Sequence, residues 1–243
     1  MVRVFGEVAA LYDDVRPGYP DQVRQAILDY GGPPVSIVEL GAGTGKGTEL
    51  LAAFDCPITA LEPDPRMAAV LRAKFSQVVV LDTTFEQWRP PAEGPGLLAC
   101  AMAWHWMDAA TRNRRAADAL GPDGVLALFQ HKYAYADPSQ GEAIGDVLNR
   151  IDPSVVLRPD HWVRDDVLDA GVWADVRERR LTTYPVFSKR RYLQLMQTFS
   201  PFRRRSPEDQ QRALDGLGAL LDDFGGSVTL ELRTTLVLAR RSG

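Results

Sequence analysis

The sequence predicts an α/β fold in which a doubly wound, mostly parallel sheet carries helices on both faces. Three observations predict it. Short, almost wholly apolar runs recur through the first half of the chain, stretches with helical periodicity separate them, and a glycine-rich loop follows the first run. Such runs are typical of parallel strands buried on both faces, and their alternation with helices implies right-handed crossovers.

Five apolar runs are the predicted parallel strands. Each is continuous rather than alternating in hydrophobicity, which is expected when helices cover both faces of a sheet. The first lies between two prolines and the glycine-rich loop. In chain order the runs are 35–40 (VSIVEL), 57–61 (PITAL), 77–81 (QVVVL), 97–103 (LLACAMA) and 124–129 (GVLALF).

Two helices can be placed from their start and stop signals. One precedes the first strand, begins at Asp21 and is closed by Gly31 and Gly32. The other follows the second strand, where Asp64 can cap the helix and Pro65 can occupy its first turn. In both segments apolar residues recur three and four positions apart, so each helix has one face suited to the sheet.

The chain is predicted to end in a helix and a strand. Ser206 opens a strong helix start, Gly225-Gly226 stops that helix, and residues 228–238 then alternate as an antiparallel strand with one more exposed face. Before them, residues 131–170 contain three prolines and predict loops and short helices that cover a site. We expect a single domain over 1–243.

Composition excludes several classes of protein. The chain has 243 residues, 45% hydrophobic and 25% charged, as in ordinary globular proteins. A net charge of -4 argues against a nucleic-acid partner. The apolar runs are too short to span a bilayer, and the start turns acidic where a signal peptide stays apolar, so we expect a cytoplasmic protein without a membrane partner. The cysteines and histidines do not have the sequence spacing of metal ligands; they are Cys56, Cys100, His105, His131 and His161.

Charge is distributed unevenly along the chain. Residues 1–172 carry 15 basic and 24 acidic side chains, whereas residues 173–243 carry 13 and 8. A mixed solvated surface would explain this. Alternatively, the basic end faces an anionic substrate or the acidic part of its own fold. The basic triplets 189–191 and 203–205 would attract carboxylate or phosphate groups if they face a cleft.

The glycine-rich loop, ELGAGTGKGT at 39–48, lies where backbone N–H groups and a helix dipole can receive a ligand. The phosphate-binding pattern GxxxxGK[ST] fails because Leu40 and Gly47 stand at two of its required positions. The dinucleotide pattern GxGxxG fails because its third glycine falls on Lys46. The remaining ExGxGxG pattern allows a nucleoside to lie directly against bare backbone.

Glu62 ends the second strand, 21 residues after Gly41. At this position a carboxylate can accept hydrogen bonds from both ribose hydroxyls of a ligand in the loop. Taken alone, Glu62 could equally be an acid that favours the N-terminus of the following helix. Together with the loop, it predicts a ligand with free 2′- and 3′-hydroxyls.

Four motifs, VELGAGTGKGT, ALEPD, AWHWMD and GPDGVLALF, resemble in order and spacing those of class I S-adenosylmethionine-dependent methyltransferases. The opening FGEVAALYDDVRPGYP is similar to the leader of small-molecule members, such as bacterial quinone C-methyltransferases and trans-aconitate methyltransferases. The resemblance covers 1–130 well and 173–243 loosely. It implies a Rossmann-like sheet of seven strands, the last antiparallel, in a bacterial protein. Gly96 departs from the family, whose members often carry an acid there.

The resemblance also implies how S-adenosylmethionine would be held. The glycine loop would line the methionine and ribose portion of the donor, and Glu62 would bind its ribose. The residues after the third strand would flank its adenine, although they could instead be an ordinary helix start. Residues 1–30 would form a lid and helix, whose Tyr19 could instead serve core packing. The implied set is Tyr12, Arg16, Tyr19, Gly41, Ala42, Gly43, Gly45, Glu62, Thr83, Thr84, Phe85, Met102 and Ala103.

Methyl transfer depends mainly on alignment, which can contribute about 7 to 11 kcal/mol. A general base contributes about 3 to 5 kcal/mol, so it is optional. His105 is the best candidate base because it follows the fourth strand; it could also simply pack between its tryptophan neighbours. Trp106, His131 and Tyr133 are candidates for the acceptor pocket, whereas His161 is expected on the surface.

These observations predict an enzyme that transfers a methyl group to a small-molecule acceptor by in-line displacement. Two alternatives stay open: a module that binds S-adenosylmethionine without transferring its methyl group, and a nucleotide-dependent oxidoreductase. We expect residues 131–170 and parts of 185–205 to cover the acceptor. A monomer or a homodimer is expected, and the acceptor's identity does not follow from the sequence.

Overall fold

The computed structural model describes residues 6–151 and 158–241. By their internal contacts the residues divide into two compact units. The first unit comprises Met1–Arg16, Lys132–Arg158 and Thr182–Arg233, and the second comprises Pro17–His131, Pro159–Leu181 and Thr234–Gly243. The predicted extent of a single domain, 1–243, stays a prediction.

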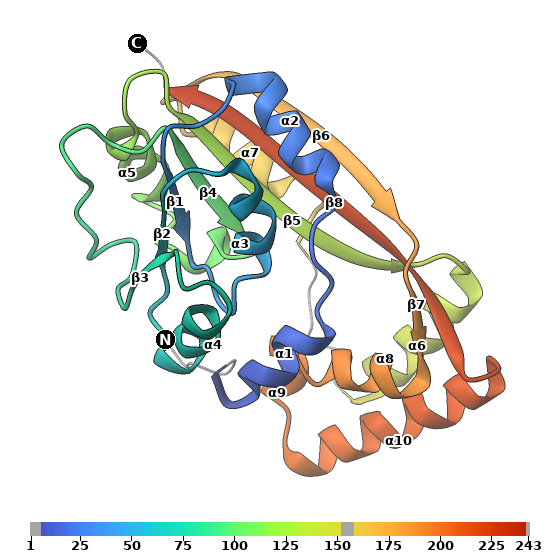
Figure 1. The fold of residues 1–243 in the computed structure, drawn as a ribbon. Helices are drawn as coiled ribbons and strands as arrows, with labels where there is room; N and C mark the ends of the chain where they lie inside the picture. Colours follow the sequence, from blue (N-terminus) through green and yellow to red (C-terminus); the bar gives the residue numbers. More distant parts are fainter. Residues whose placement is uncertain (1–5, 152–157, 242–243) are drawn as a thin grey trace. The chain divides into compact units, whose positions relative to one another are not determined.

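The second unit is built on a parallel sheet (Figure 1). Its strands follow the order β3-β2-β1-β4-β5-β8-β6, and neighbours from β3 to β5 are parallel. Their bounds are β1 Ile37–Leu40, β2 Ile58–Leu61, β3 Val79–Leu81, β4 Leu97–Ala101, β5 Val125–Tyr135, β6 Trp173–Thr183 and β8 Ser227–Arg241. Residues 132–135 of β5, 182–183 of β6 and 227–233 of β8 belong to the first unit. This mostly parallel, seven-strand path confirms the predicted fold class.

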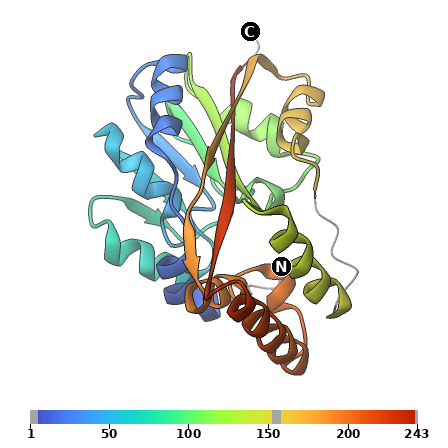
Figure 2. The ribbon, with the colours of Figure 1, turned by 90° about the vertical axis from the view of Figure 1, so that its right-hand side faces the viewer.

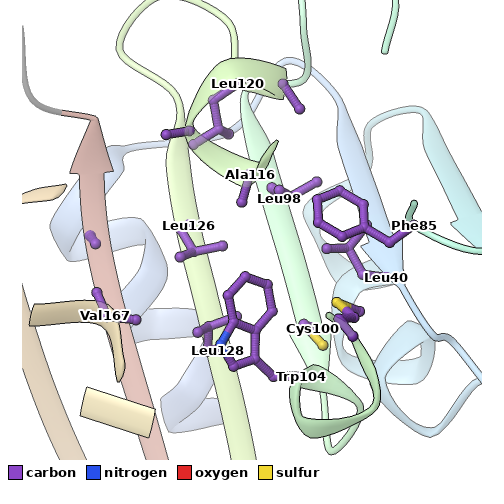
Figure 3. Close-up of a cluster of buried hydrophobic side chains, with 14 of the residues drawn as sticks. Leu40, Phe85, Leu98, Cys100, Trp104, Ala116, Leu120, Leu126, Leu128 and Val167 are labelled. Carbon is purple, nitrogen blue, oxygen red and sulfur yellow. The ribbon is translucent and has the colours of Figure 1, made fainter. Parts of the chain in front are cut away.

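Alternating residues of these strands supply two cores, one on each face of the sheet. On β4, Leu97 and Ala99 belong to the core that contains α2 and α3, whereas Leu98 and Cys100 belong to the core that contains α5 and α7. Figure 3 shows the latter core, with Leu98 close to side chains of α5 and β5. The helices are α2 Asp21–Gly31, α3 Lys46–Leu51, α4 Pro65–Lys74, α5 Arg112–Ala119 and α7 Trp162–Asp169.

Start and stop signals of the helices are confirmed. Asp64 accepts a hydrogen bond from the backbone N–H of Arg66, and Pro65 begins α4. Gly32 ends α2 with a φ of 75°. Short 3-10 turns η1 Gly6–Val8, η2 Ala52–Phe54 and η3 Trp104–Trp106 complete the local structure. Within residues 6–151 and 158–241, none of the helices is both long and apolar enough to cross a bilayer.

Two strand predictions need correction. Run 77–81 was predicted to be buried on both faces, yet Val79 is 57% exposed, because β3 is the last strand of the path and pairs with β2 alone among the described strands. Run 124–129 was predicted to end at Phe129, yet β5 continues to Tyr135. Its extension mixes polar and aromatic residues, so it lacks the continuous apolar run on which the prediction depended.

The first unit is mainly helical. Its α6 packs against α10, as Figures 1 and 2 show, and its core includes Tyr192, Phe202 and Leu217. Ser206 caps α10 as predicted, accepting a hydrogen bond from the backbone N–H of Asp209. The elements are α1 Ala9–Val15, α6 Pro138–Ile151, β7 Val186–Ser188, α8 Lys189–Met196, α9 Ser200–Arg203 and α10 Pro207–Asp223, with β7 antiparallel to β8.

Segment 131–170 differs from the loops and short helices predicted for it. Residues 131–135 belong to β5, and α6 is a regular helix of 14 residues. The prolines misled the interpretation: Pro138 begins α6, a position that proline tolerates, whereas Pro153 lies outside the described residues. The segment is also divided between the two units, so its role as a cover stays a prediction.

Candidate active site

The carboxyl ends of β1, β2 and β4 meet at one edge of the sheet in the second unit. β1 pairs with β2 through Leu40 and Leu61, and with β4 through Glu39 and Ala99. Ligands of doubly wound sheets bind outside the carboxyl ends of the strands. Three predicted segments follow these strands and therefore share the edge: loop 41–45, Glu62 and residues 102–106.

Loop 41–45 brings its main chain against the end of β4. Gly41 has a φ of +64°, and a Cβ built on it would lie 2.5 Å from the Cβ of Ala103. A side chain at this position would therefore be strained and would also collide with Ala103. Gly41 is required for this close approach, which places two residues of the predicted donor site in contact.

Glu62 is buried and holds the loop in place. Its Oε2 accepts a hydrogen bond from the backbone N–H of Gly43 at 2.8 Å, and its Oε1 accepts one from that of Asp64, also at 2.8 Å. These two backbone bonds fix the orientation of the Glu62 carboxylate at the edge of the sheet where the loop lies. Its contact with a ribose stays a prediction.

Behind the loop lies Glu39, fully buried on β1. Its Oε2 accepts a hydrogen bond from Thr48 Oγ1 at 2.5 Å. Its Oε1 and the buried Oγ1 of Thr44 have no hydrogen-bond partner among the described residues. Burial raises the pKa of Glu39 to about 8, because the Thr48 bond that lowers it is weaker and the charge of Glu62 raises it further.

The end of β4 is locally strained. Met102 has a φ of +57°, which a side chain other than that of glycine rarely adopts. Its backbone N–H donates to the Phe129 carbonyl oxygen, and its Sδ accepts from the backbone N–H of His131 at 3.0 Å. Strain of this kind gathers at functional sites. It turns the chain out of the sheet just before residues 104–106.

Residues 83–85 follow β3, which pairs with β2 through Leu81. Thr83 and Thr84 are half-buried, whereas Phe85 is 4% exposed and belongs to the core. Arg115 on α5 donates to the carbonyl oxygens of Phe85 and Trp88, both at 2.9 Å. The segment is thus held in place from α5, and its contact with adenine stays a prediction.

His105 and Trp106 lie in η3, which we call the His105 turn (Trp104–Trp106). Their rings are 4.8 Å apart between centroids, and both side chains are half-buried. Trp162 of α7 approaches the His105 ring edge-on, at 6.3 Å. His105 is accessible enough to reach a ligand, and its role as a base stays a prediction.

His131 is buried at the end of the second unit's part of β5. Its Nε2 lies 3.0 Å from the carbonyl oxygen of Gly18, and its Nδ1 lies 3.0 Å from Oγ1 of Thr234. Since a carbonyl only accepts, Nε2 carries the proton in the neutral ring. The ring of Tyr19 stacks on that of His131 at 4.2 Å. These contacts anchor segment 18–19 to β5, and an acceptor contact of His131 stays a prediction.

Tyr12, Arg16 and Tyr133 belong to the first unit, where they lie together. Arg16 is buried, donates from Nε to Thr198 Oγ1 at 2.8 Å, and lies over the ring of Phe199 at 4.0 Å. It also lies over the rings of Tyr12 and Tyr133, at 4.9 and 5.6 Å. The structure thus gives Arg16 a packing role, and its predicted contact with the donor stays a prediction.

Basic residues near the end of the chain pair with acids of the same unit. Ion pairs join Lys189 to Asp222, Arg191 to Asp14, and Arg203 to Glu7. Two of these pairs, Lys189–Asp222 and Arg191–Asp14, have exposed side chains, as a mixed solvated surface would, whereas Arg191 and Arg203 pair with acids from the start of the chain. His161 is exposed, as predicted, and lies 3.4 Å from Asp165.

Sequence reasoning missed two groups of residues around the site. Thr48 binds the carboxylate of Glu39, and its position nine residues after a strand-ending acid is the signal that could have found it. Arg112 and Asp166 form an ion pair beside the His105 turn. They lie 54 positions apart and on different helices, so no local pattern connects them.

Comparison with known proteins shows what the central part of the chain is similar to. A family model described as a methyltransferase domain matches residues 38–128. An uncharacterized methyltransferase of Mycobacterium tuberculosis is 36% identical over 124 residues, 51% of this chain and 50% of that protein. One of Schizosaccharomyces pombe is 31% identical over 130 residues, 52% of each chain. The chain thus spans about half the length of the curated relatives it matches.

Solved structures share the fold at low sequence identity. A proposed type II methyltransferase of Anaeromyxobacter dehalogenans has a TM-score of 0.70 at 15% identity, covering 93% of this chain and 97% of that one. A Haemonchus contortus phosphoethanolamine N-methyltransferase, solved with S-adenosylhomocysteine, has a TM-score of 0.57 at 14% identity and covers 98% and 58%. The sheet therefore has the Rossmann-like methyltransferase fold, and residues 38–128 are similar to the methyltransferase domain.

Proposed function

We propose that this protein is an S-adenosylmethionine-dependent methyltransferase that methylates a small-molecule acceptor by in-line displacement. One observation carries the proposal: loop 41–45 presents bare main chain beside a buried carboxylate, Glu62, that is fixed by two backbone bonds. This arrangement suits a nucleoside whose ribose hydroxyls are free. The match of the methyltransferase family to residues 38–128 supports the same proposal.

The residues present fit the donor. A Cβ on Gly41 would fill the approach to Ala103, so the chain keeps this position bare. Buried polar atoms of Glu39 and Thr44 retain bonding capacity beside the loop. We infer that Gly41, Ala42, Gly43 and Gly45 line the methionine and ribose portion and that Glu62 binds the ribose. Further contacts would come from Thr83, Thr84, Phe85, Met102 and Ala103, and from Tyr19 at the amino-acid end. A donor contact of Tyr12 and Arg16, which belong to the first unit, stays a prediction.

S-adenosylmethionine, when bound, supplies a methyl group activated by a positively charged sulfur. The chain must then orient an acceptor and, where the acceptor carries a proton, remove that proton. His105 follows β4 at the edge of the sheet where ligands of such folds bind. The ordinary pKa of histidine, near 6.5, suits a base that works near neutral pH. Trp106 beside it offers an aromatic face to an apolar or aromatic acceptor. A specific branch of the family, a cytoplasmic location and a monomeric or dimeric state stay predictions.

Calorimetry with S-adenosylhomocysteine tests the donor site. The Glu62→Ala variant should bind about 5- to 150-fold more weakly than the wild type, corresponding to about 1 to 3 kcal/mol for a charged hydrogen bond. Glu93→Ala, which removes an exposed carboxylate from the same unit, should bind like the wild type. Equal affinity in the wild type and Glu62→Ala would refute the ribose assignment.

Transfer is tested separately, with labelled S-adenosylmethionine and a panel of small acceptors. Methylated product supports the enzyme, whereas donor binding without any product would favour a module that only binds the donor. An absorbance change of added nicotinamide nucleotide would favour an oxidoreductase. Lys46, which occupies the third glycine position of the dinucleotide pattern and begins α3, argues against that outcome.

A further inference from the structure

We propose that Asp166, on α7, is a positioning residue that orients His105 and Trp106 through Trp104 and Arg112. The proposal rests on the proposed function, because it assigns the His105 turn to the acceptor side of that site. Asp166 lies 61 positions after His105 in the sequence, and α7 itself does not follow any strand of the parallel sheet. It is linked to the site by four donor nitrogens on three side chains, those of Trp104, Arg112 and Asn113.

The carboxylate of Asp166 is saturated with donors from two elements. Its Oδ2 accepts hydrogen bonds from Trp104 Nε1 at 2.8 Å, Asn113 Nδ2 at 2.9 Å and Arg112 Nε at 3.1 Å. Its Oδ1 accepts from Arg112 Nη2, which closes a two-point ion pair. Such paired, planar contacts fix both distance and angle. Asp166 therefore fixes the position of the His105 turn relative to α5.

Trp104 connects Asp166 to the next two residues of the turn. Its indole N–H is bound by Asp166, and its carbonyl oxygen accepts from Arg112 Nη1 at 3.1 Å, so both its side chain and its main chain are held. The turn is closed by bonds from Trp106 N–H to the Ala103 carbonyl and from Met107 N–H to the Trp104 carbonyl. Because Trp104 is buried and fixed, the turn that carries the half-buried side chains of His105 and Trp106 is fixed with it.

A second side chain of α7 reaches the same turn. Trp162 lies one helical turn before Asp166, so the two share a face of the helix. The Arg112 guanidinium lies over the ring of Trp162 at 5.7 Å and over that of Trp104 at 5.5 Å. The edge-on contact of Trp162 with His105 comes from the same helix. α7 thus contributes both an acid that fixes the turn and a ring that borders His105.

Orientation explains this arrangement better than stability does. The side chains of Arg112 and Asp166 are 7% and 18% exposed, and burying such a pair costs solvation energy that its attraction roughly repays. Burial alone would raise the pKa of Asp166, but the bonds from Arg112, Trp104 and Asn113 lower it below its ordinary value. Asp166 is therefore charged near neutral pH and keeps its donors in place.

The test uses the full chain and three variants. Asp166→Asn removes the charge. Trp104→Phe removes the indole N–H together with one of the two fused rings, while it keeps one aromatic ring and both partners of the Arg112–Asp166 pair, and Asp169→Asn is the matched control. Asp169 is exposed at the end of the same helix. Nuclear magnetic resonance follows the ring protons of the histidines, with His131 and His161 as internal references, and the exchange of the indole protons with solvent.

We expect Asp166→Asn and Trp104→Phe each to shift the His105 ring signals and not those of His161, whereas Asp169→Asn shifts neither. Combining the two changes should add little to either alone, because both break one path. Exchange of the Trp104 indole proton should accelerate about tenfold in Asp166→Asn, the loss expected for one hydrogen bond to a charged group. If Asp166→Asn does not fold, Trp104→Phe alone decides.

Unchanged His105 signals in Asp166→Asn, or in Trp104→Phe, would overturn the proposal, since Asp166 is proposed to act on the turn through the Trp104 indole N–H. S-adenosylhomocysteine affinity is measured in parallel and should fall much less than in Glu62→Ala, because loop 41–45 and Glu62 follow β1 and β2 rather than β4. If the wild type itself does not bind S-adenosylhomocysteine, the proposed function fails, while the resonance experiment still decides whether Asp166 orients the turn.

Discussion

Replacing Glu39 by glutamine should change how the stability of the protein depends on pH. Glu39 is fully buried, and only one of its oxygens has a hydrogen-bond partner among the described residues. Burial raises its pKa from 4.5 to about 8. Near neutral pH the folded protein therefore keeps Glu39 protonated, whereas the unfolded chain has released that proton. The stability that the neutral form contributes is fully present below pH 4.5 and is lost as the pH rises towards 8.

The size of the effect follows from the two pKa values. Between them, the free energy of unfolding falls by about 1.4 kcal/mol for each pH unit that Glu39 alone controls. From pH 6.0 to 7.5 the loss is about 2 kcal/mol, because the folded state begins to release its proton only at the upper end. This window lies above the pI of about 5.5, so precipitation near zero net charge is avoided.

Urea unfolding of the wild type and Glu39→Gln at several pH values measures the difference. Glutamine has no proton to release, so the stability of the wild type relative to the variant should fall by about 2 kcal/mol across the window. A constant offset is expected as well, since the new amide group must find a partner. The exposed Glu93→Gln should show no pH-dependent difference. Parallel curves for the wild type and Glu39→Gln would refute a neutral Glu39.

Two further variants test the loops around the site, and a third tests a glycine of α6. Gly41→Ala should lower the melting temperature and abolish S-adenosylhomocysteine binding in calorimetry, because its Cβ would meet Ala103 at 2.5 Å. At Gly145 nothing lies within 4 Å of the position of a Cβ, so Gly145→Ala should stabilise α6 by about 0.5 to 1 kcal/mol. Arg115→Ala removes the donor to two carbonyl oxygens after β3 and should speed amide hydrogen exchange in that segment by about tenfold. Unchanged exchange would show that the segment keeps its conformation without Arg115.

The sequence was sufficient to predict those elements whose cause is local. Asp64 and Ser206 cap helices because their side chains bond the next turn, and this depends on a few neighbouring residues. The buried strands β1, β2 and β4 were predicted for a similar reason, since burial on both faces requires a continuous apolar run. β6 was missed because its exposed residues are mostly charged, as edge strands commonly are.

The parts of the site that main chain forms could be predicted from the sequence. The parts formed by side chains that lie far apart in the sequence could not. Gly41 and Glu62 lie at strand ends, so the order of the strands alone places them together. Asp166 and Arg112 meet only because α5 and α7 pack on the same face of the sheet, which no spacing rule expresses. The conformation of Met102 belongs to the same class, since the strain depends on the bonds that surround it.

Gly47 shows why a failed motif can carry information. In the sequence it is the residue that breaks the phosphate-binding pattern after Lys46. In the structure, a Cβ on Gly47 would lie 2.3 Å from Oε1 of Glu39 and 2.7 Å from the Cβ of Ala101. The start of α3 must therefore be bare because a carboxyl group is buried against it. A phosphate-binding loop needs a hydroxyl side chain at this position, so the space that Glu39 occupies is itself a physical reason why this loop does not have that role.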